Sequence, residues 1–320
     1  MLISLGKQLR KLASLPIAAA LIGTAICQQG SAQINFGGLI FMGTTETITP
    51  NGSPTLTYMQ VNGKLYLYYV NRDNSTIYVD VGLTGQPIST GIVVYSGGVT
   101  DVGADANFGS TGDTILLTYI APNQVPMAAV LATNGYSIIS NVSINTSSTG
   151  FNSNFVPTPA PYGSSAWGEV AVVGNGNYVY LYATLDNGQT FGYLHQISSI
   201  PTISRPAISQ DGVYFGWTNN TSGGRNAVFG RDGSMSYIPG YFCGQNNRNG
   251  AYAGVGLVNY AGGVYVFSQN VLNAQQAQYV FTLNGGASWS GLYQPGNAMR
   301  WNPALAFNGG AVFFLYLDQD

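Results

Sequence analysis

The sequence contains few charged residues, a single histidine and two cysteines. Charged side chains make up 7% of the 320 residues, against about 25% in an average globular protein. One histidine with two cysteines leaves no cluster of the kind that binds zinc. The sequence also has no phosphate-binding loop and no Rossmann glycine fingerprint. We therefore expect neither a metal nor a cofactor.

Catalysis by a serine triad is disfavoured because the chain has a single histidine. Such a triad would depend on His195, which lies in a strand-like segment where a structural role is the simpler interpretation. No G-x-S-x-G motif surrounds a serine nucleophile.

Glycine, tyrosine and apolar residues are abundant instead. The chain has 43 glycines and 22 tyrosines, and 45% of its residues are hydrophobic. This composition is typical of many short strands joined by tight turns, and its apolar runs are too frequent for a disordered chain. No window after Ala32 has a helical period. The sequence therefore predicts an all-β protein.

The N-terminus has the features of a secretory signal. Lys7, Arg10 and Lys11 precede an apolar stretch over 12–27, and Gly30-Ser31-Ala32 offers small residues for cleavage. The apolar stretch is shorter than the roughly 20 residues that span a bilayer. We predict a signal peptide over 1–32 and a mature domain over 33–320. That domain would be secreted, periplasmic or in the cell envelope, without a stable membrane span.

Cleavage after Ala32 would make the protein more acidic. It would remove three of the ten basic residues and none of the twelve acidic ones, leaving a net charge of −5. A negative charge argues against nucleic acid or an anionic membrane as the main partner. Only Cys243 would remain, so the mature chain has no internal disulfide.

A two-strand unit with a glycine in its turn recurs along the chain. The copies cover 55–70, 106–120, 168–184, 206–218, 254–269 and 303–318. Their turn glycines are spaced by 49, 64, 36, 51 and 47 residues, and a propeller blade takes about 40–50. We predict a single β-propeller of about six four-stranded blades, with one irregular blade or insertion. The segment 34–49 would complete the last blade and close the ring.

Two turns carry a more specific motif. The segments Thr184–Phe191 and Thr282–Trp289 resemble the Asp-box, Ser/Thr-x-Asp-x-Gly-x-Thr/Ser-aromatic, with Asn284 replacing aspartate in the second. Asp232-Gly233 is a degenerate third candidate. The motif resembles that of the sialidase-like propellers. This resemblance implies that the turns join the two outer strands of a blade, have a structural role, and lie on the face away from the ligand. We call the face that carries these turns the turn face, and the opposite face, where the ligand is expected, the top face.

The top face is where we expect a ligand. Loops before the first strand of a blade and after its second strand should emerge there, and five of the six arginines of 33–320 fall in such loops. Arginine binds carboxylates bidentately, and aromatic faces stack on sugar rings. The candidate ligand-binding residues are Arg72, Trp167, Arg205, Trp217, Arg225, Arg248, Tyr252, Arg300 and Trp301. The alternative is that a tryptophan at the start of a first strand belongs to the core between blades and that Arg72–Asp73 is a solvated turn pair.

These residues favour glycan binding without turnover. Arg205, Arg248 and Arg300 could imitate the arginine triad that the sialidase resemblance implies. However, residues 33–71 contain no arginine, where that family has its first one. One alternative is a glycoside hydrolase with Glu169, Asp105 or Asp73 as the acid/base, since such enzymes need two flanking carboxylates. Another is a cell-envelope scaffold, which would expose apolar patches on the top face.

Overall fold

The computed structural model describes most of the chain as short strands. It describes residues 20–26, 35–42, 54–71, 73–83, 90–161, 167–209, 211–219, 226–230, 234–237, 254–260, 262–270, 276–291, 293, 304–307 and 311–317. These residues contain 23 strands and one short 3₁₀ turn at Asn175–Asn177. Within them, no helix has the length and apolarity needed to cross a membrane. The all-β prediction is confirmed.

The described strands form six antiparallel sheets, each ordered from an inner to an outer strand. Blade 1 is β3 (Thr55–Met59), β4 (Lys64–Asn71), β5 (Thr76–Leu83) and β6 (Ile92–Ser96). Blade 2 is β7 (Val102–Phe108), β8 (Thr114–Ile120), β9 (Pro126–Leu131) and β10 (Ile138–Ser143). Blade 3 is β11 (Thr158–Pro161), β12 (Gly168–Val173), β13 (Val179–Thr184) and β14 (Gly192–Gln196).

The second half of the ring follows the same order. Blade 4 is β15 (Ala207–Ile208), β16 (Tyr214–Thr218), β17 (Asn226–Gly230) and β18 (Met235–Tyr237). Blade 5 is β19 (Gly256–Tyr260), β20 (Gly263–Asn270) and β21 (Gln276–Thr282), with a bridge from Tyr279 to Tyr293 at its outer edge. Blade 6 is β22 (Ala304–Phe307), β23 (Ala311–Leu317), β1 (Ala20–Ile26) and β2 (Asn35–Met42).

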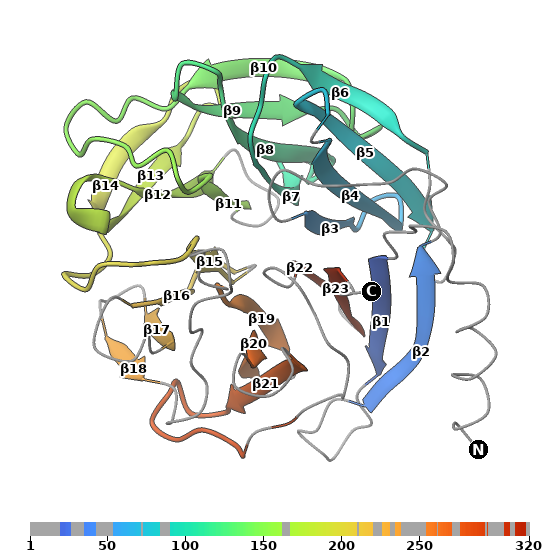
Figure 1. Ribbon diagram of the computed structural model, residues 1–320, viewed down its shortest axis with the longest axis vertical. Coiled ribbons are helices and arrows are strands. Elements are labelled where there is room, and N and C mark those ends of the chain that lie inside the picture. The colour runs from blue at the N-terminus through green and yellow to red at the C-terminus, as the bar shows by residue number, and fades with distance from the viewer. Residues whose placement is uncertain are drawn as a thin grey trace.

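The six inner strands surround a common axis. β3 contacts β7, and contacts continue through β11, β15, β19 and β22 back to β3. Figure 1 views this ring with the sheets radiating from the centre. The propeller prediction is therefore confirmed.

Blade 3 corrects one detail of the predicted repeat. The copy over 168–184 consists of β12 and β13, the second and third strands, whereas the other five copies match first and second strands. The short strand β11 precedes it and is the true inner strand. The sequence has Gly163 between β11 and β12, 51 residues after Gly112 and 49 before Gly212. The repeat is therefore regular when Gly163 is taken as the turn glycine of blade 3. The uneven spacings of 64 and 36 residues arose because Gly176, in the turn between β12 and β13, was used instead.

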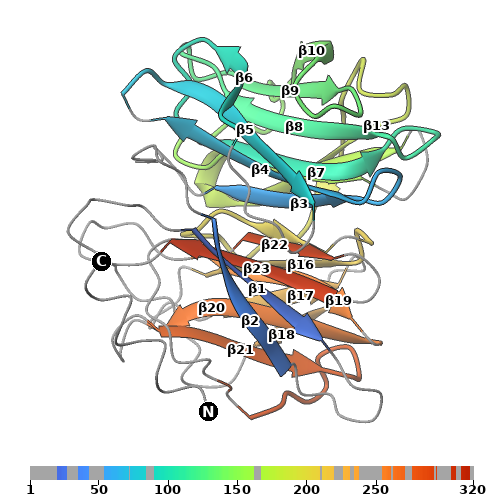
Figure 2. The ribbon, with the colours of Figure 1, turned by 90° about the vertical axis from the view of Figure 1, so that its right-hand side faces the viewer.

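The last blade joins the two ends of the chain. β1 pairs along its whole length with β23, and β2 pairs with the other edge of β1 (Figures 1 and 2). β2 lies within the segment expected to close the ring, but β1 lies within the predicted signal peptide. The structure is that of the uncleaved chain, so cleavage after Ala32 stays a prediction.

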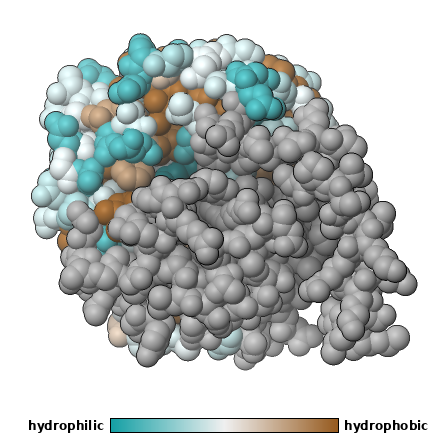
Figure 3. Space-filling view, viewed as in Figure 1, coloured by the Kyte–Doolittle hydropathy of each residue, from teal (hydrophilic) through white to brown (hydrophobic). Residues whose placement is uncertain are grey.

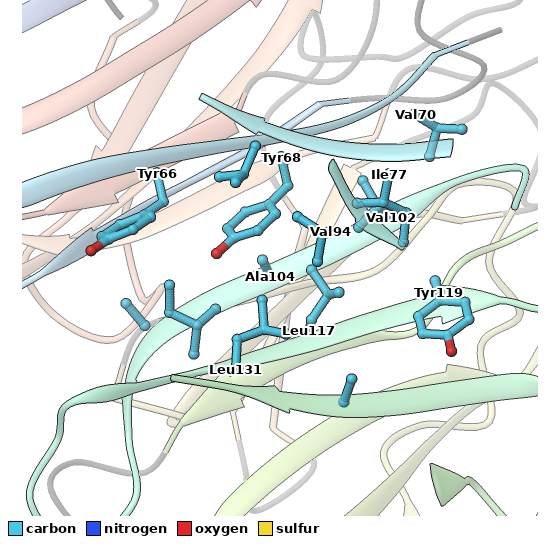
Figure 4. Close-up of a cluster of buried hydrophobic side chains, with 14 of the residues drawn as sticks. Tyr66, Tyr68, Val70, Ile77, Val94, Val102, Ala104, Leu117, Tyr119 and Leu131 are labelled. Carbon is cyan, nitrogen blue, oxygen red and sulfur yellow. The ribbon is translucent and has the colours of Figure 1, made fainter. Parts of the chain in front are cut away.

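The core lies between the blades. Because strands within a blade are covered on both faces, apolar side chains on both sides of a strand are buried. In Figure 4, Tyr66 and Tyr68 of β4 face Ala104, Leu117 and Leu131 of blade 2. The hydroxyls of Tyr66 and Tyr68 donate to the carbonyls of Thr133 and Gly135, both at 2.7 Å. These bonds fix blade 1 to blade 2.

Candidate functional site

A cavity of about 100 Å³ lies on the propeller axis. Each inner strand contributes two consecutive residues to its wall: Thr55-Leu56, Ala104-Asp105, Thr158-Pro159, Ala207-Ile208, Gly256-Leu257 and Ala304-Leu305. The first member of each pair is small, and the second is apolar in every strand except β7. Asp105 therefore interrupts an otherwise apolar collar.

Asp105 is held in place by blade 1. Its Oδ1 accepts hydrogen bonds from the Thr57 hydroxyl at 3.0 Å and from the Ala106 N–H at 2.8 Å. The Ala106 N–H also donates to the Thr57 hydroxyl at 2.7 Å. Burial raises the pKa of Asp105 to about 7, against the lowering effect of these two hydrogen bonds. The carboxyl group is therefore partly protonated at neutral pH.

Arg205 lies at the top-face end of the cavity because it precedes β15. Its Nε donates to the Thr158 hydroxyl at 3.1 Å, and its Nη1 donates to the Val102 carbonyl at 3.0 Å. Burial lowers the pKa of Arg205, and the nearby carboxylate of Asp101 raises it. The pKa of Asp101 rises to about 6 through burial, opposed by Arg205. Arg205 thus links blades 2, 3 and 4 and has only part of its guanidinium left for a ligand.

The correction of blade 3 moves two predicted residues. Trp167 and Glu169 flank the start of β12, a second strand, so they lie on the turn face and not on the top face. The indole N–H of Trp167 donates to Oε1 of Glu169 at 3.1 Å, and Glu169 is buried. The structure therefore separates both residues from Arg205 and Asp105.

Two further predicted residues have clear positions. Trp217 is fully buried between blades 3 and 4, in a cluster with Leu181 and Phe215. It is part of the hydrophobic core and offers no surface to a ligand, which corrects the prediction that Trp217 is a ligand contact. Asp73 is exposed in the β4–β5 turn on the top face, where its N–H donates to Oδ1 of Asn71 at 2.8 Å.

The other predicted ligand contacts lie outside the described residues. These are Arg72, Arg225, Arg248, Tyr252, Arg300 and Trp301. Among the predicted residues that the structure describes, it brings together Arg205 and Asp105. Sequence reasoning missed Asp101 and Thr158, which complete this group. The recurring proline followed by threonine or alanine at the start of inner strands was the available signal for Thr158.

The two Asp-box-like turns form the same local structure. Each joins or follows the third strand of its blade. Asp186 accepts hydrogen bonds from the Thr184 hydroxyl, the Thr190 hydroxyl and the N–H groups of Gln189 and Thr190, at 2.6–3.0 Å. These bonds lower the pKa of Asp186 to about 2.

Asn284 reproduces this pattern in blade 5. Its Oδ1 accepts from the Thr282 hydroxyl at 2.9 Å and from the Ser288 N–H at 2.9 Å, and its Nδ2 donates to the Ser288 hydroxyl at 2.8 Å. The side chains at both positions are committed to the turn, which supports a structural role for them.

Solved structures of similar fold include several propeller lectins. A mutant of the Aleuria aurantia lectin in complex with α-methyl-L-fucoside has a TM-score of 0.58 at 11% identity, covering 82% of this chain and 88% of the lectin. The SapL1 lectin in complex with α-methyl fucoside has a TM-score of 0.57 at 13% identity, covering 85% and 90%. A putative TolB from Agrobacterium tumefaciens has a TM-score of 0.56 at 11% identity, covering 95% and 99%.

Comparisons by sequence give no family. No protein-family model and no curated protein matches this chain. At 11–13% identity the structural likeness shows the propeller fold alone. The function must therefore be argued from this chain's own site.

Proposed function

We propose that this chain is an exported carbohydrate-binding propeller that holds glycans at the top mouth of its axial cavity without hydrolysing them. The observation that carries the proposal is the axial cavity itself, where polar groups of three blades converge within an apolar collar. Small-ligand sites commonly combine an apolar lining with a few placed polar groups. A cavity of about 100 Å³ suits one substituent of a sugar, with the ring at the mouth.

Three further observations support this proposal. Propeller lectins that bind fucosides are among the structures of similar fold. The two turns built on Asp186 and Asn284 resemble the Asp-box turns of sialidase-like propellers, to which we propose the chain is related. The low overall charge favours recognition through hydroxyl groups and aromatic rings over recognition through ion pairs.

The described surface gives no support to the scaffold alternative. Its large exposed apolar side chains lie in outer strands or in turns on the turn face: Val61, Leu83, Val93, Tyr136, Ile138, Ile139, Leu185, Tyr193, Leu194 and Leu283. In the coloured part of the surface in Figure 3, hydrophilic and hydrophobic residues lie side by side. A scaffold was expected to expose apolar patches on the top face instead.

A glycoside hydrolase is the second candidate, and the raised pKa of Asp105 favours it. A general acid in such an enzyme must be protonated near the working pH, and burial gives Asp105 a pKa of about 7. The Asp105→Asn variant separates the two functions because Asn keeps the acceptor for Thr57 and Ala106. A lectin variant keeps its affinity within about threefold and releases no sugar. If the protein is a hydrolase, the wild type releases free sugar and the Asp105→Asn variant does not.

The location of binding is tested by filling the cavity. Ala207 lines the axial wall, so Ala207→Leu should weaken binding of the full chain to immobilised fucosylated, sialylated or galactosylated glycans. Gly192→Ala is the matched control, because a methyl group there meets no atom within 4 Å. Equal binding by Ala207→Leu and wild type, with both folded by circular dichroism, would remove the axial cavity from the proposal.

A further inference from the structure

A second and larger cavity lies between blades 4 and 5 on the turn face. Its volume is about 260 Å³. Blade 4 provides Tyr214, Val228, Gly230 and Ser234, and blade 5 provides Thr282, Gly285, Gly286, Ala287 and Trp289. All the contributing loops are first-to-second or third-to-fourth strand turns, so the cavity faces away from the axial mouth.

The corresponding gap between blades 2 and 3 is filled. There Phe191, the aromatic residue that ends the Asp186 turn, is 6% exposed and packs with Phe108, Leu116 and Val130 of blade 2. A Cβ on Gly188 of that turn would lie 2.5 Å from Val130. Phe108 and Leu116 thus close the space beneath the turn.

Blade 4 leaves this space open because its residues are smaller. Phe215 and Trp217 of β16 point into the cluster with blade 3, so Gly216 between them lies on the side of blade 5. Gly216 pairs with Val228, and Gly230 pairs with Tyr214. Trp289, which takes the place of Phe191, is half-buried and borders the cavity. Gly230 of blade 4 and Trp289 of blade 5 thus border the pocket from opposite sides.

The lining has the chemistry of a neutral, hydroxyl-rich ligand. Trp289 and Tyr214 supply aromatic walls, and the negative face of an aromatic ring attracts the C–H edge of an apolar surface. The hydroxyls of Ser234 and Tyr214 supply polar groups, and the Tyr214 hydroxyl lies near Gly285. The Thr282 hydroxyl donates to Oδ1 of Asn284 and belongs to the turn. No charged residue is among the described lining residues. The cavity is slightly smaller than the roughly 300 Å³ at which sites for drug-sized ligands begin.

We propose that the cavity between blades 4 and 5 binds one neutral monosaccharide unit, whose apolar face stacks on Trp289 while its hydroxyls reach the polar rim. This inference rests on the proposed carbohydrate binding but places a second, independent site on the opposite face. The chain would then be bivalent, with its two sites on opposite faces and open to two separate glycans.

The experiment titrates the full chain with methyl glycosides of fucose, galactose, mannose and N-acetylglucosamine, followed by tryptophan fluorescence and calorimetry. Trp289→Ala removes the stacking surface, and Ala287→Leu fills the cavity from an exposed position. Leu283→Ala is the matched control, because Leu283 is 57% exposed in the same turn and does not line the cavity.

We expect Trp289→Ala and Ala287→Leu to weaken binding of one glycoside at least tenfold. Leu283→Ala and Ala207→Leu should leave the affinity of this site unchanged. Loss of all binding in Ala207→Leu with full binding in Ala287→Leu and Trp289→Ala would overturn this inference and leave the proposed function standing. Absence of saccharide binding by the wild type would overturn both. If Trp289→Ala fails to fold, Ala287→Leu alone decides.

Discussion

At the scale of single residues, the two carboxyl groups with the largest opposite pKa shifts have different roles. Asp186 is exposed and surrounded by donors, so its charged form is stabilised, whereas Asp105 is desolvated and its charged form is destabilised. The first arrangement stabilises a turn. The second keeps an ionisable group inside a cavity at a cost to stability, as is common at functional sites.

The Asp186 turn should tolerate asparagine but not alanine. Asn284 shows that an amide can hold a similar turn, so Asp186→Asn should lose less free energy of unfolding than Asp186→Ala at pH 7. Asp186→Ala removes four acceptor contacts and should lower the free energy of unfolding by about 1–2 kcal/mol, since the site is exposed. Denaturant unfolding measures both. Equal losses in the two variants would contradict the structural role.

The turn should also weaken in acid. Because the folded pKa of Asp186, about 2, is below the unfolded value of 3.8, its contribution is present above pH 4 and fades as the pH falls towards 2. The difference in unfolding free energy between wild type and Asp186→Ala should therefore shrink below pH 4. A constant difference from pH 7 to pH 2 would show that the charge contributes nothing.

Asp105 should give the opposite pH dependence. Its folded pKa of about 7 is above the unfolded value of 3.8, so the folded state binds the proton more tightly and loses stability as the pH rises from 4 to 7. Asp105→Asn has no carboxyl group at this position and lacks this loss. Its free energy of unfolding should therefore rise relative to that of wild type by about 1–3 kcal/mol between pH 5 and pH 8. Denaturant midpoints across this range test the prediction, and parallel curves would refute a buried, titrating Asp105.

At the scale of strands, the closeness of neighbouring inner strands matters most. A Cβ on Gly103 of β7 would lie 2.5 Å from Nη2 of Arg205, 2.6 Å from the Thr118 hydroxyl and 2.8 Å from the Pro157 carbonyl. Gly103→Ala must therefore push β11 or Arg205 outward. We expect a loss of about 2 kcal/mol or more, read from the thermal midpoint. Gly192→Ala, with open space around it, should change stability by less than about 0.5 kcal/mol, and similar losses in both variants would contradict the close approach.

The strand pattern was largely readable from the sequence, but its register in blade 3 was not. Five of the six copies were aligned correctly because the turn glycine falls between two clear apolar strands. In blade 3 the inner strand is Thr-Pro-Ala-Pro, whose prolines do not indicate a strand. The more apolar β12–β13 pair took its place in the alignment. That one shift moved Trp167 and Glu169 to the wrong face.

The site was harder to predict than the fold for a related reason. Loop positions can be assigned to a face from strand order, which placed Arg205 and Asp73 correctly. Whether a side chain faces a ligand or a neighbouring blade depends on tertiary packing, which strand order does not reveal. Trp217 is an example, because it is buried in the core. The cavity beneath Trp289 depends on glycines in a different blade, so the motif around Asn284 gave no indication of it.

At the scale of the whole molecule, the two possible fates of the N-terminus exclude each other. β1 occupies the position between β23 and β2, and cleavage after Ala32 would remove it. The signal-peptide prediction expects intact-mass spectrometry of the exported protein to find a chain beginning at Gln33. A full-length mass would show that β1 is retained as the third strand of blade 6 and that residues 1–32 are not a cleaved leader.

The central claim is that this propeller binds carbohydrate, and a glycan array probed with the full chain tests it most directly. We expect saturable retention on a defined set of glycans, reduced by Ala207→Leu and by Ala287→Leu but not by Gly192→Ala. Retention on none of the glycans, by a protein shown to be folded, would contradict it.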